Sequence, residues 1–151
     1  MDLSPFYPKR YNQAHSDGVG QRAAAGELSG LRLLVVEDHD DCRMMLKFAL
    51  VQRGAEVETA THGAEALEKF ASGFYDVVVS DINMPLVDGL TMMREIRASG
   101  RPVTAIALTA SPLTSERATA LEYGFDAHLY KPVDIADLVR EVLACERRRK
   151  A

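Results

Sequence analysis

The sequence predicts an α/β protein built on a doubly wound parallel sheet of (βα)5 type. After Gly30, strand-like apolar segments alternate with segments of helical periodicity, five of each. This alternation is typical of βαβ units with right-handed crossovers. The chain of 151 residues is 47% hydrophobic and 26% charged, so we expect one globular domain with a sizeable core.

The individual elements follow from the apolar runs and from the residues that flank them. Short apolar or β-branched runs predict strands at residues 31–36, 56–60, 76–80, 103–108 and 127–130. The segments between and after them predict helices at residues 40–53, 63–72, 89–98, 114–123 and 134–147. Four of these helices are followed by a glycine that favours a left-handed cap: Gly54, Gly73, Gly100 and Gly124. Asp134 is placed to cap the start of the last helix.

The two ends of the chain differ from this regular part at 31–147. Residues 1–30 combine several prolines and glycines with no sustained period, so we expect a flexible leader or linker there. Its aromatic residues favour the alternative, in which the segment docks on the domain: Phe6, Tyr7 and Tyr11. Residues 148–151 predict a short basic tail that complements the dipole of the last helix, and contact with an acidic partner is the alternative.

Several functional classes are disfavoured by composition. A net charge of −4 is too mild to indicate a nucleic-acid partner, and no Gly-rich loop follows the first strand as a nucleotide site requires. No apolar run approaches the roughly 18 residues of a membrane helix, and no signal peptide is recognisable. Cys42 and Cys145 lie far apart, as in a reduced intracellular protein. We therefore expect a cytoplasmic protein without membrane contact.

Acidic residues end two of the predicted strands. Glu37 and Asp38 follow the first strand, and Asp81 follows the third. Carboxyl ends of parallel strands share one edge of the sheet, where such folds hold ligands. Three neighbouring carboxylates repel one another unless a cation compensates, and Mg²⁺ suits such oxygen ligands. We predict Asp38 and Asp81 as direct ligands, Glu37 as the orienting group of a metal-bound water, and the backbone carbonyl of Asn83 as a further ligand; helix capping is the alternative.

Two more strand ends complete a site for phosphoryl transfer. Thr109 ends the fourth strand, and Lys131 ends the fifth. Asp81 can act as a nucleophile that forms an acyl phosphate, while the metal, Lys131 and Thr109 each contact a phosphoryl oxygen. Taken singly, these are ordinary strand-end and surface residues, so the prediction depends on their agreement. The Lys131-Pro132 bond is a candidate cis peptide.

At these positions the chain resembles the receiver (CheY-like) domain of two-component response regulators. The resemblance spans about Leu31 to Cys145, and its subtype is similar to receivers associated with hybrid histidine kinases. The motifs that carry it are Val35-Val36-Glu37-Asp38, Ser80-Asp81-Ile82-Asn83-Met84-Pro85 with Asp88-Gly89, Ala107-Leu108-Thr109-Ala110 and Tyr130-Lys131-Pro132. It implies a flavodoxin-like fold with strand order 2-1-3-4-5. It also implies that Asp81 accepts phosphate, with Mg²⁺ as cofactor, from a sensor histidine kinase or a histidine phosphotransfer protein.

The resemblance further implies how the signal leaves the site. Thr109 would follow the phosphoryl group, and the fourth helix, fifth strand and fifth helix would carry the change outward; the same face is the candidate surface for a homodimer. Many receivers place Phe or Tyr where this chain has His128, and a surface-facing strand histidine is the preferred interpretation. Many also have Asp in place of Glu37, a variation that should preserve Mg²⁺ binding.

Partner contacts are predicted on the first helix. Met45 and Leu46 occur at core spacing, whereas Met44 and Phe48 belong to a second stripe, which we expect to meet the phosphodonor. A broader core, or cover from the leader, is the alternative for this stripe. Pro132, beside Lys131, is a further candidate contact. No helix-turn-helix pattern follows, so we expect output to an unknown target through protein contacts, without direct nucleic-acid binding.

Three functional classes remain. The favoured one is a stand-alone phosphoacceptor switch that catalyses only its own phosphorylation and dephosphorylation, and so is not an enzyme acting on an external substrate. The second is a receiver-like binding module that works without phosphorylation. The third is a metal-dependent phosphatase, which needs a general acid two residues after Asp81, where the chain has Asn83.

Overall fold

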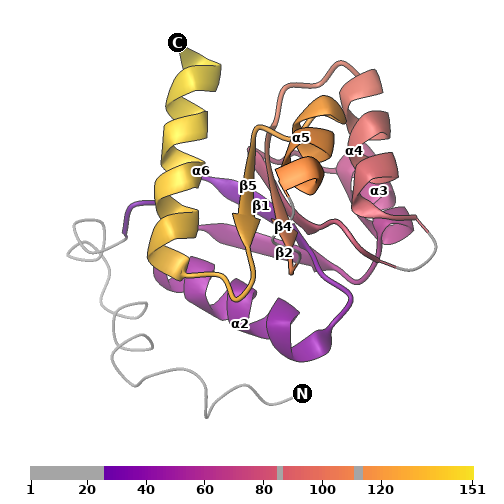
Figure 1. The fold of residues 1–151 in the computed structure, drawn as a ribbon. Coiled ribbons are helices and arrows are strands. Elements are labelled where there is room, and N and C mark those ends of the chain that lie inside the picture. Colours follow the sequence, from indigo (N-terminus) through magenta and orange to yellow (C-terminus); the bar gives the residue numbers. More distant parts are fainter. Residues whose placement is uncertain (1–25, 85–86, 111–113) are drawn as a thin grey trace.

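The computed structural model describes residues 26–84, 87–110 and 114–151. A parallel five-stranded sheet lies between two helical layers (Figure 1). Its strands are β1 (Arg32–Val36), β2 (Glu56–Ala60), β3 (Val77–Asp81), β4 (Thr104–Thr109) and β5 (Ala127–Tyr130). The helices are α2 (Asp40–Gln52), α3 (Gly63–Ser72), α4 (Gly89–Ala98), α5 (Thr114–Glu122) and α6 (Ile135–Lys150). The strand order β2-β1-β3-β4-β5 confirms the predicted (βα)5 topology.

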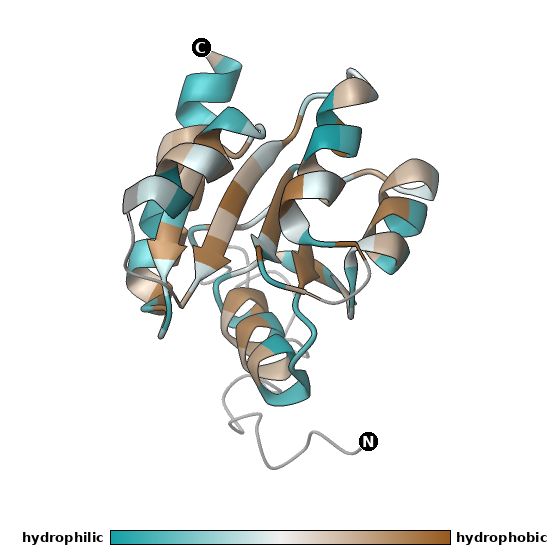
Figure 2. Ribbon diagram, turned by 45° about the vertical axis from the view of Figure 1, so that its right-hand side comes forward, coloured by the Kyte–Doolittle hydropathy of each residue, from teal (hydrophilic) through white to brown (hydrophobic). Residues whose placement is uncertain are grey.

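The core has two halves, one on each face of the sheet. Successive side chains of a strand point to opposite faces, and β1 shows this clearly. Leu34 and Val36 pack with α3, α4 and α5, whereas Leu33 and Val35 pack with α2 and α6. Figure 2 shows mainly brown, hydrophobic strands between helices whose ribbons mix brown and teal. Burial on both faces explains why β1, β3 and β4 are apolar runs without polar alternation.

The packed domain includes residues that lie upstream of the predicted boundary at residue 31. Leu28 is fully buried in the α2–α6 half of the core, and its backbone N–H donates to the Arg53 carbonyl at 2.8 Å. Gly26 has a φ of +97°, and an added Cβ would lie 2.4 Å from the Arg53 carbonyl oxygen. Residues 26–30 are therefore packed against the end of α2. The predictions for Phe6, Tyr7 and Tyr11 fall outside the described residues.

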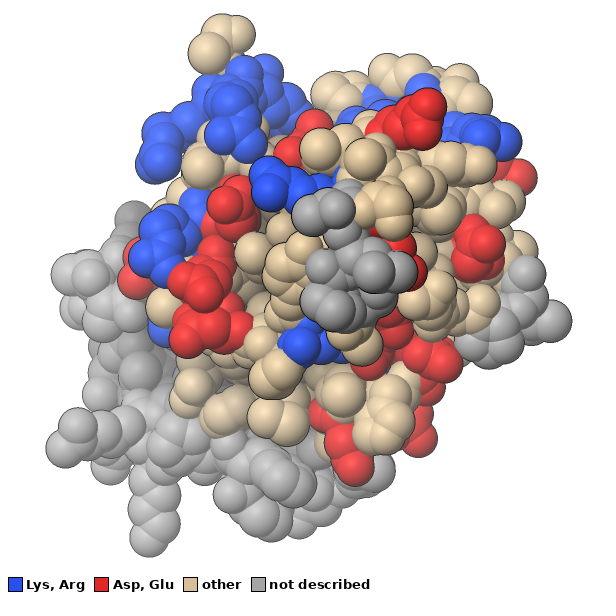
Figure 3. Space-filling model, in the orientation of Figure 1, with Lys and Arg blue, Asp and Glu red and all other residues tan. Residues whose placement is uncertain are grey.

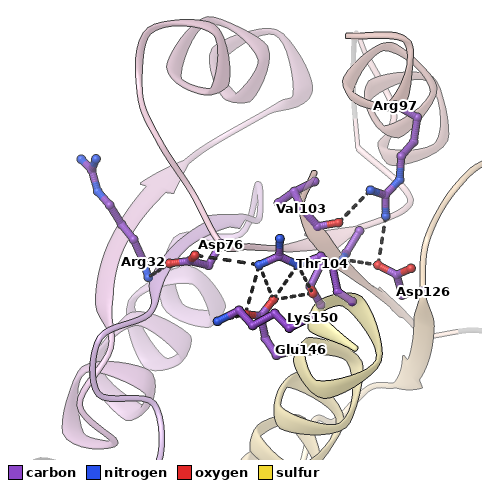
Figure 4. Close-up of polar contacts among 10 residues, drawn as sticks. Arg32, Asp76, Arg97, Val103, Thr104, Asp126, Glu146 and Lys150 are labelled. Carbon is purple, nitrogen blue, oxygen red and sulfur yellow. Dashed lines mark hydrogen bonds and ion pairs between the residues drawn. The ribbon is translucent and has the colours of Figure 1, made fainter. Parts of the chain in front are cut away.

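The chain also differs from prediction at its other end, where α6 continues to Lys150. Lys and Arg side chains gather over this end of α6 in Figure 3. Arg149 is not a solvated tail residue, because its guanidinium bonds the Glu146 carboxylate at 3.0 and 3.1 Å. Glu146 is 5% exposed and accepts a 2.6 Å hydrogen bond from the Thr104 hydroxyl (Figure 4). This network fixes the last turns of α6 to the N-terminal end of β4.

Two smaller observations complete the fold. Gly54, Gly100 and Gly124 have the positive φ that their predicted caps require, but Gly73 is extended, with φ −124°, so that prediction is wrong there. Within the described ranges, no helix has the length and apolar character needed to span a membrane.

Candidate functional site

The predicted acidic residues meet at the carboxyl edge of the sheet. Strands β1 and β3 are neighbours, with Val36 beside Ser80, so the residues that follow them emerge together. Glu37, Asp38 and Asp81 each offer an oxygen within 4.8 Å of the others. Glu37 and Asp81 are buried, at 1% and 8% exposure, whereas Asp38 faces solvent. The arrangement is a half-open acidic cluster in which one carboxylate is reachable from outside.

Lys131, the residue that follows β5, completes this cluster. Its ammonium lies 2.9 and 3.2 Å from the two Glu37 carboxylate oxygens and 3.1 Å from Asp81 Oδ2. The interpretation of Lys131 as a plain surface lysine is therefore wrong. The chain is held in place by a 2.8 Å bond from the Lys131 N–H to the Thr109 carbonyl. The following bond to Pro132 is cis, as predicted.

The electrostatics of the cluster leave a surplus of negative charge. Burial raises the pKa of the Glu37 carboxyl, and the neighbouring Asp81 raises it further, although the Lys131 ammonium opposes both effects. Burial alone would lower the pKa of Lys131, but its hydrogen bonds to Glu37 and Asp81 raise it above the ordinary value. One ammonium thus serves two carboxylates, and a third, Asp38, stands beside them. A cation bound here would relieve this repulsion.

The β3–α4 loop turns back tightly against Asp81. The Gly89 N–H donates to the Ile82 carbonyl at 2.8 Å, and a Cβ on Gly89 would lie 2.4 Å from the Asp81 carbonyl oxygen. Only glycine fits this approach, which explains its place after the capping residue Asp88. Asn83 is exposed, and its backbone N–H donates to Asp81 Oδ1 over 3.4 Å. The role of its carbonyl as a metal ligand stays a prediction.

Thr109 contacts Glu116, a residue that the sequence analysis did not identify as part of the site. Thr109 ends β4, directly after the Leu108 that pairs with Asp81, and it is fully buried. Its hydroxyl donates to the Glu116 carboxylate of α5 at 2.9 Å. No sequence signal marks Glu116, because an acid in the first turn of a helix is most simply explained by the helix dipole.

His128 is half-buried and is not the fully surface-facing histidine of the preferred interpretation. Both ring nitrogens are buried and have no hydrogen-bond partner among the described residues. The ring packs edge-on against Tyr130, with centroids 5.0 Å apart. Burial lowers the pKa of the imidazole, Arg117 lowers it further, and Glu116 opposes them. A half-buried imidazole with a lowered pKa therefore lies at the position where the resemblance places an aromatic ring in many receivers.

The predicted contact residues on α2 are only partly as expected. Leu46 is buried, but Met45 is 71% exposed and so is not the core residue that its spacing suggested. Met44 and Phe48 are half-buried, and Pro132 is exposed near the site. A role for these residues in partner contact stays a prediction.

Comparisons with known proteins place this geometry in a family. A family model for the response regulator receiver domain matches residues 33–143. Transcriptional regulatory protein PrrA of Mycobacterium leprae is 40% identical over 124 residues, which cover 82% of this chain and 53% of that protein. Sensor histidine kinase RcsC of Escherichia coli is 35% identical over 130 residues, which cover 85% of this chain and 14% of that protein. The chain thus spans about half the length of the transcriptional regulatory proteins it matches.

Solved structures support the same assignment. The receiver domain of the Francisella response regulator 1452 superposes with a TM-score of 0.74 at 28% identity, covering 79% of this chain and 98% of that one. Chemotaxis protein CheY4 of Vibrio cholerae gives a TM-score of 0.73 at 28% identity, covering 76% and 98%. Because the family model covers well over half of the sequence, the chain belongs to the response regulator receiver domain family.

Proposed function

We propose that this receiver domain accepts a phosphoryl group from a phosphohistidine donor onto Asp81, with Mg²⁺ bound, and signals through protein–protein contacts. The observation that supports the proposal best is the sharing of one ammonium, that of Lys131, between Asp81 and the buried Glu37. Such a site holds an anionic nucleophile next to a fixed positive charge. Phosphoryl transfer depends mainly on this kind of positioning and charge compensation.

The donor set fits Mg²⁺. Three carboxylates with oxygens within 4.8 Å of one another form a hard, anionic site, which is the kind that Mg²⁺ prefers. When bound, the ion supplies positive charge for the oxygens of the transferred group. We assign direct ligation to Asp38 and Asp81, the orientation of a bound water to Glu37, and a further oxygen to the Asn83 carbonyl.

The residues of the chain then divide the remaining work. An Asp81 carboxylate oxygen attacks phosphorus, and the phosphorus–nitrogen bond to the donor imidazole breaks as the new phosphorus–oxygen bond forms. The Lys131 ammonium, already 3.1 Å from Asp81 Oδ2, would pair with one oxygen of the transferred phosphoryl group. The Thr109 hydroxyl would donate a hydrogen bond to a second phosphoryl oxygen. Asn83 is exposed beside the site but carries no acid, so it favours a switch over a phosphatase with a general acid.

The family and relatives support the choice of donor and output. Receiver domains take phosphoryl groups in two-component signalling, and the chain resembles part of a protein named as a sensor histidine kinase. We therefore propose a histidine kinase or a histidine phosphotransfer protein as donor. That this domain makes no direct nucleic-acid contact stays a prediction, since its relatives include proteins named as transcriptional regulators.

A small phosphodonor tests the proposal without the cognate kinase. The protein is incubated with acetyl phosphate and Mg²⁺ and measured by intact-protein mass spectrometry, beside Asp81→Asn and the control Asp41→Asn. Asp41 is an exposed acid of the first turn of α2. A single phosphoryl adduct is expected on the wild type and the control, and none on Asp81→Asn. Absence of an adduct on folded wild-type protein would favour the phosphorylation-independent binding module instead.

A further inference from the structure

The strongest unexplained contact is the hydrogen bond between Thr109 and Glu116. The Thr109 side chain is fully buried at the end of β4, and its hydroxyl lies 2.9 Å from Glu116 Oε2 on α5. Glu116 also lines a small cavity of about 150 Å³ together with Ile82 and Asn83, the two residues that follow Asp81. The carboxylate is thus held at the border between the phosphoryl site and α5.

The direction of this bond restricts what Thr109 can do. A threonine hydroxyl has one proton to donate, and an ionised carboxylate can only accept. The proton of Thr109 is therefore committed to Glu116 in this state of the protein. The oxygens of a phosphoryl group are acceptors as well, so Thr109 cannot donate to both groups at once.

We propose that Glu116 is a latch that holds Thr109 in its resting orientation, so that phosphorylation of Asp81 must break the Thr109–Glu116 hydrogen bond. This inference rests on the proposed phosphoacceptor function and adds a regulatory residue to it. Glu116 acts through Thr109 and does not touch the reacting atoms. It sets how readily the resting domain responds to a phosphoryl group, and its removal makes the response easier.

The packing of α5 explains why breaking this bond would matter beyond the site. Among the side chains that the structure describes on α5, only that of Ala120 is buried. The helix is thus lightly anchored, and the Glu116 contact is one of its ties to β4. The neighbouring strand β5, which contacts α5, carries His128, and the buried ring nitrogens of His128 have no hydrogen-bond partner among the described residues. Release of Glu116 would free one end of α5 and turn a phosphorylation event into a change at this surface.

Beryllofluoride, which binds carboxylates as a mimic of the phosphoryl group, measures the latch directly. Its dissociation constant with Mg²⁺ present is determined by isothermal titration calorimetry for the wild type, Glu116→Ala and the control Glu122→Ala. Glu122 is an exposed acid at the other end of α5. Because a hydrogen bond no longer has to be broken, Glu116→Ala is expected to bind about threefold to tenfold more tightly, and Glu122→Ala like the wild type.

A double-mutant cycle separates the latch from a merely structural effect. Thr109→Val removes the hydroxyl and should weaken binding, and Glu116→Ala should add no gain in that background. If Glu116→Ala proves unfolded by circular dichroism, Glu116→Gln keeps the shape with a neutral acceptor and should give a smaller gain, of about twofold.

The outcomes distinguish the two levels of the proposal. Equal affinity of the wild type and the folded Glu116 variant would overturn the latch and leave the phosphoacceptor function standing. The same gain with and without the Thr109 hydroxyl would also overturn it, because Glu116 would then act by another route. Failure of folded wild-type protein to bind beryllofluoride would overturn the phosphoacceptor function and the latch together.

Discussion

Replacing Glu37 by glutamine is expected to stabilise the metal-free protein and to weaken its binding of Mg²⁺. Glu37 is 1% exposed and shares the Lys131 ammonium with Asp81. Burial raises the pKa of its carboxyl above the value of 4.5 expected in an unfolded chain, and Asp81 adds to this. The ionised form therefore destabilises the fold, a cost that develops as pH rises from 4.5 through the folded pKa. A glutamine amide still accepts from Lys131 but carries no charge.

The two effects have comparable magnitudes. Neutralising a buried charge of this kind is worth about 1 kcal/mol to the metal-free protein. Loss of a group that orients a metal-bound water weakens metal affinity by about tenfold to a hundredfold. At a Mg²⁺ concentration about ten times the wild-type dissociation constant, Mg²⁺ stabilises the wild type by about 1.4 kcal/mol and the variant by about 0.4 kcal/mol or less. Glu37→Gln should therefore be more stable than the wild type without metal, and no more stable than the wild type in Mg²⁺.

Urea unfolding at pH 7, followed by far-ultraviolet circular dichroism, checks both effects. The free energy of unfolding is measured in EDTA and in Mg²⁺ for the wild type, Glu37→Gln and the control Asp41→Asn, which removes an exposed charge outside the cluster. If Glu37→Gln is less stable than the wild type in EDTA, the inference that the ionised Glu37 carboxylate destabilises the metal-free fold is wrong. An unchanged Mg²⁺ increment would show that Glu37 does not support the metal.

Two further expectations concern stability. Glu146→Ala should lower the free energy of unfolding by about 3 kcal/mol, because the Thr104 hydroxyl and the Arg149 guanidinium lose their shared carboxylate; a urea-unfolding loss under about 1 kcal/mol would contradict this. Burial alone raises the Glu146 pKa, but these hydrogen bonds hold it below its ordinary value, so this contribution is present above pH 4.5 and lost as pH falls through the folded pKa. Burial lowers the pKa of His128, so the free energy of unfolding should decrease as pH falls from about 6.5 through the lower pKa of the folded state. His128→Phe should abolish that component, measured as the change in urea midpoint between acidic and neutral pH, and an unchanged pH profile would argue against a buried neutral imidazole.

The parts of the site that were predictable are those fixed by strand ends. An apolar run buried on both faces must end where the sheet ends, so Asp81 and Thr109 could be placed at one edge before their distances were known. Lys131 was placed at the same edge because it follows the last parallel strand. Adjacent strand order then brings Glu37 and Asp38 to the same edge. Residue type and strand position were sufficient for these side chains because the backbone of the sheet carries them there.

The parts that were missed depend on packing between elements. Alternation places His128 and Tyr130 on one face of β5 but does not say how far that face is covered. Here the ring nitrogens of His128 are buried, whereas Tyr130 is 45% exposed. Glu116 reaches Thr109 across a helix–strand contact that no local pattern encodes. Met45 lies between two helical stripes, so its spacing fitted the core although its side chain is exposed.

The most direct test of the central claim is to locate the phosphoryl group. Sodium borohydride reduces an acyl phosphate to an alcohol and so converts a phosphorylated aspartate to homoserine, which peptide mass spectrometry identifies. After incubation with acetyl phosphate and Mg²⁺, homoserine is expected at position 81 alone, and EDTA should prevent its formation. Homoserine at another carboxylate of the cluster, such as Asp38, or its formation in EDTA, would contradict the account.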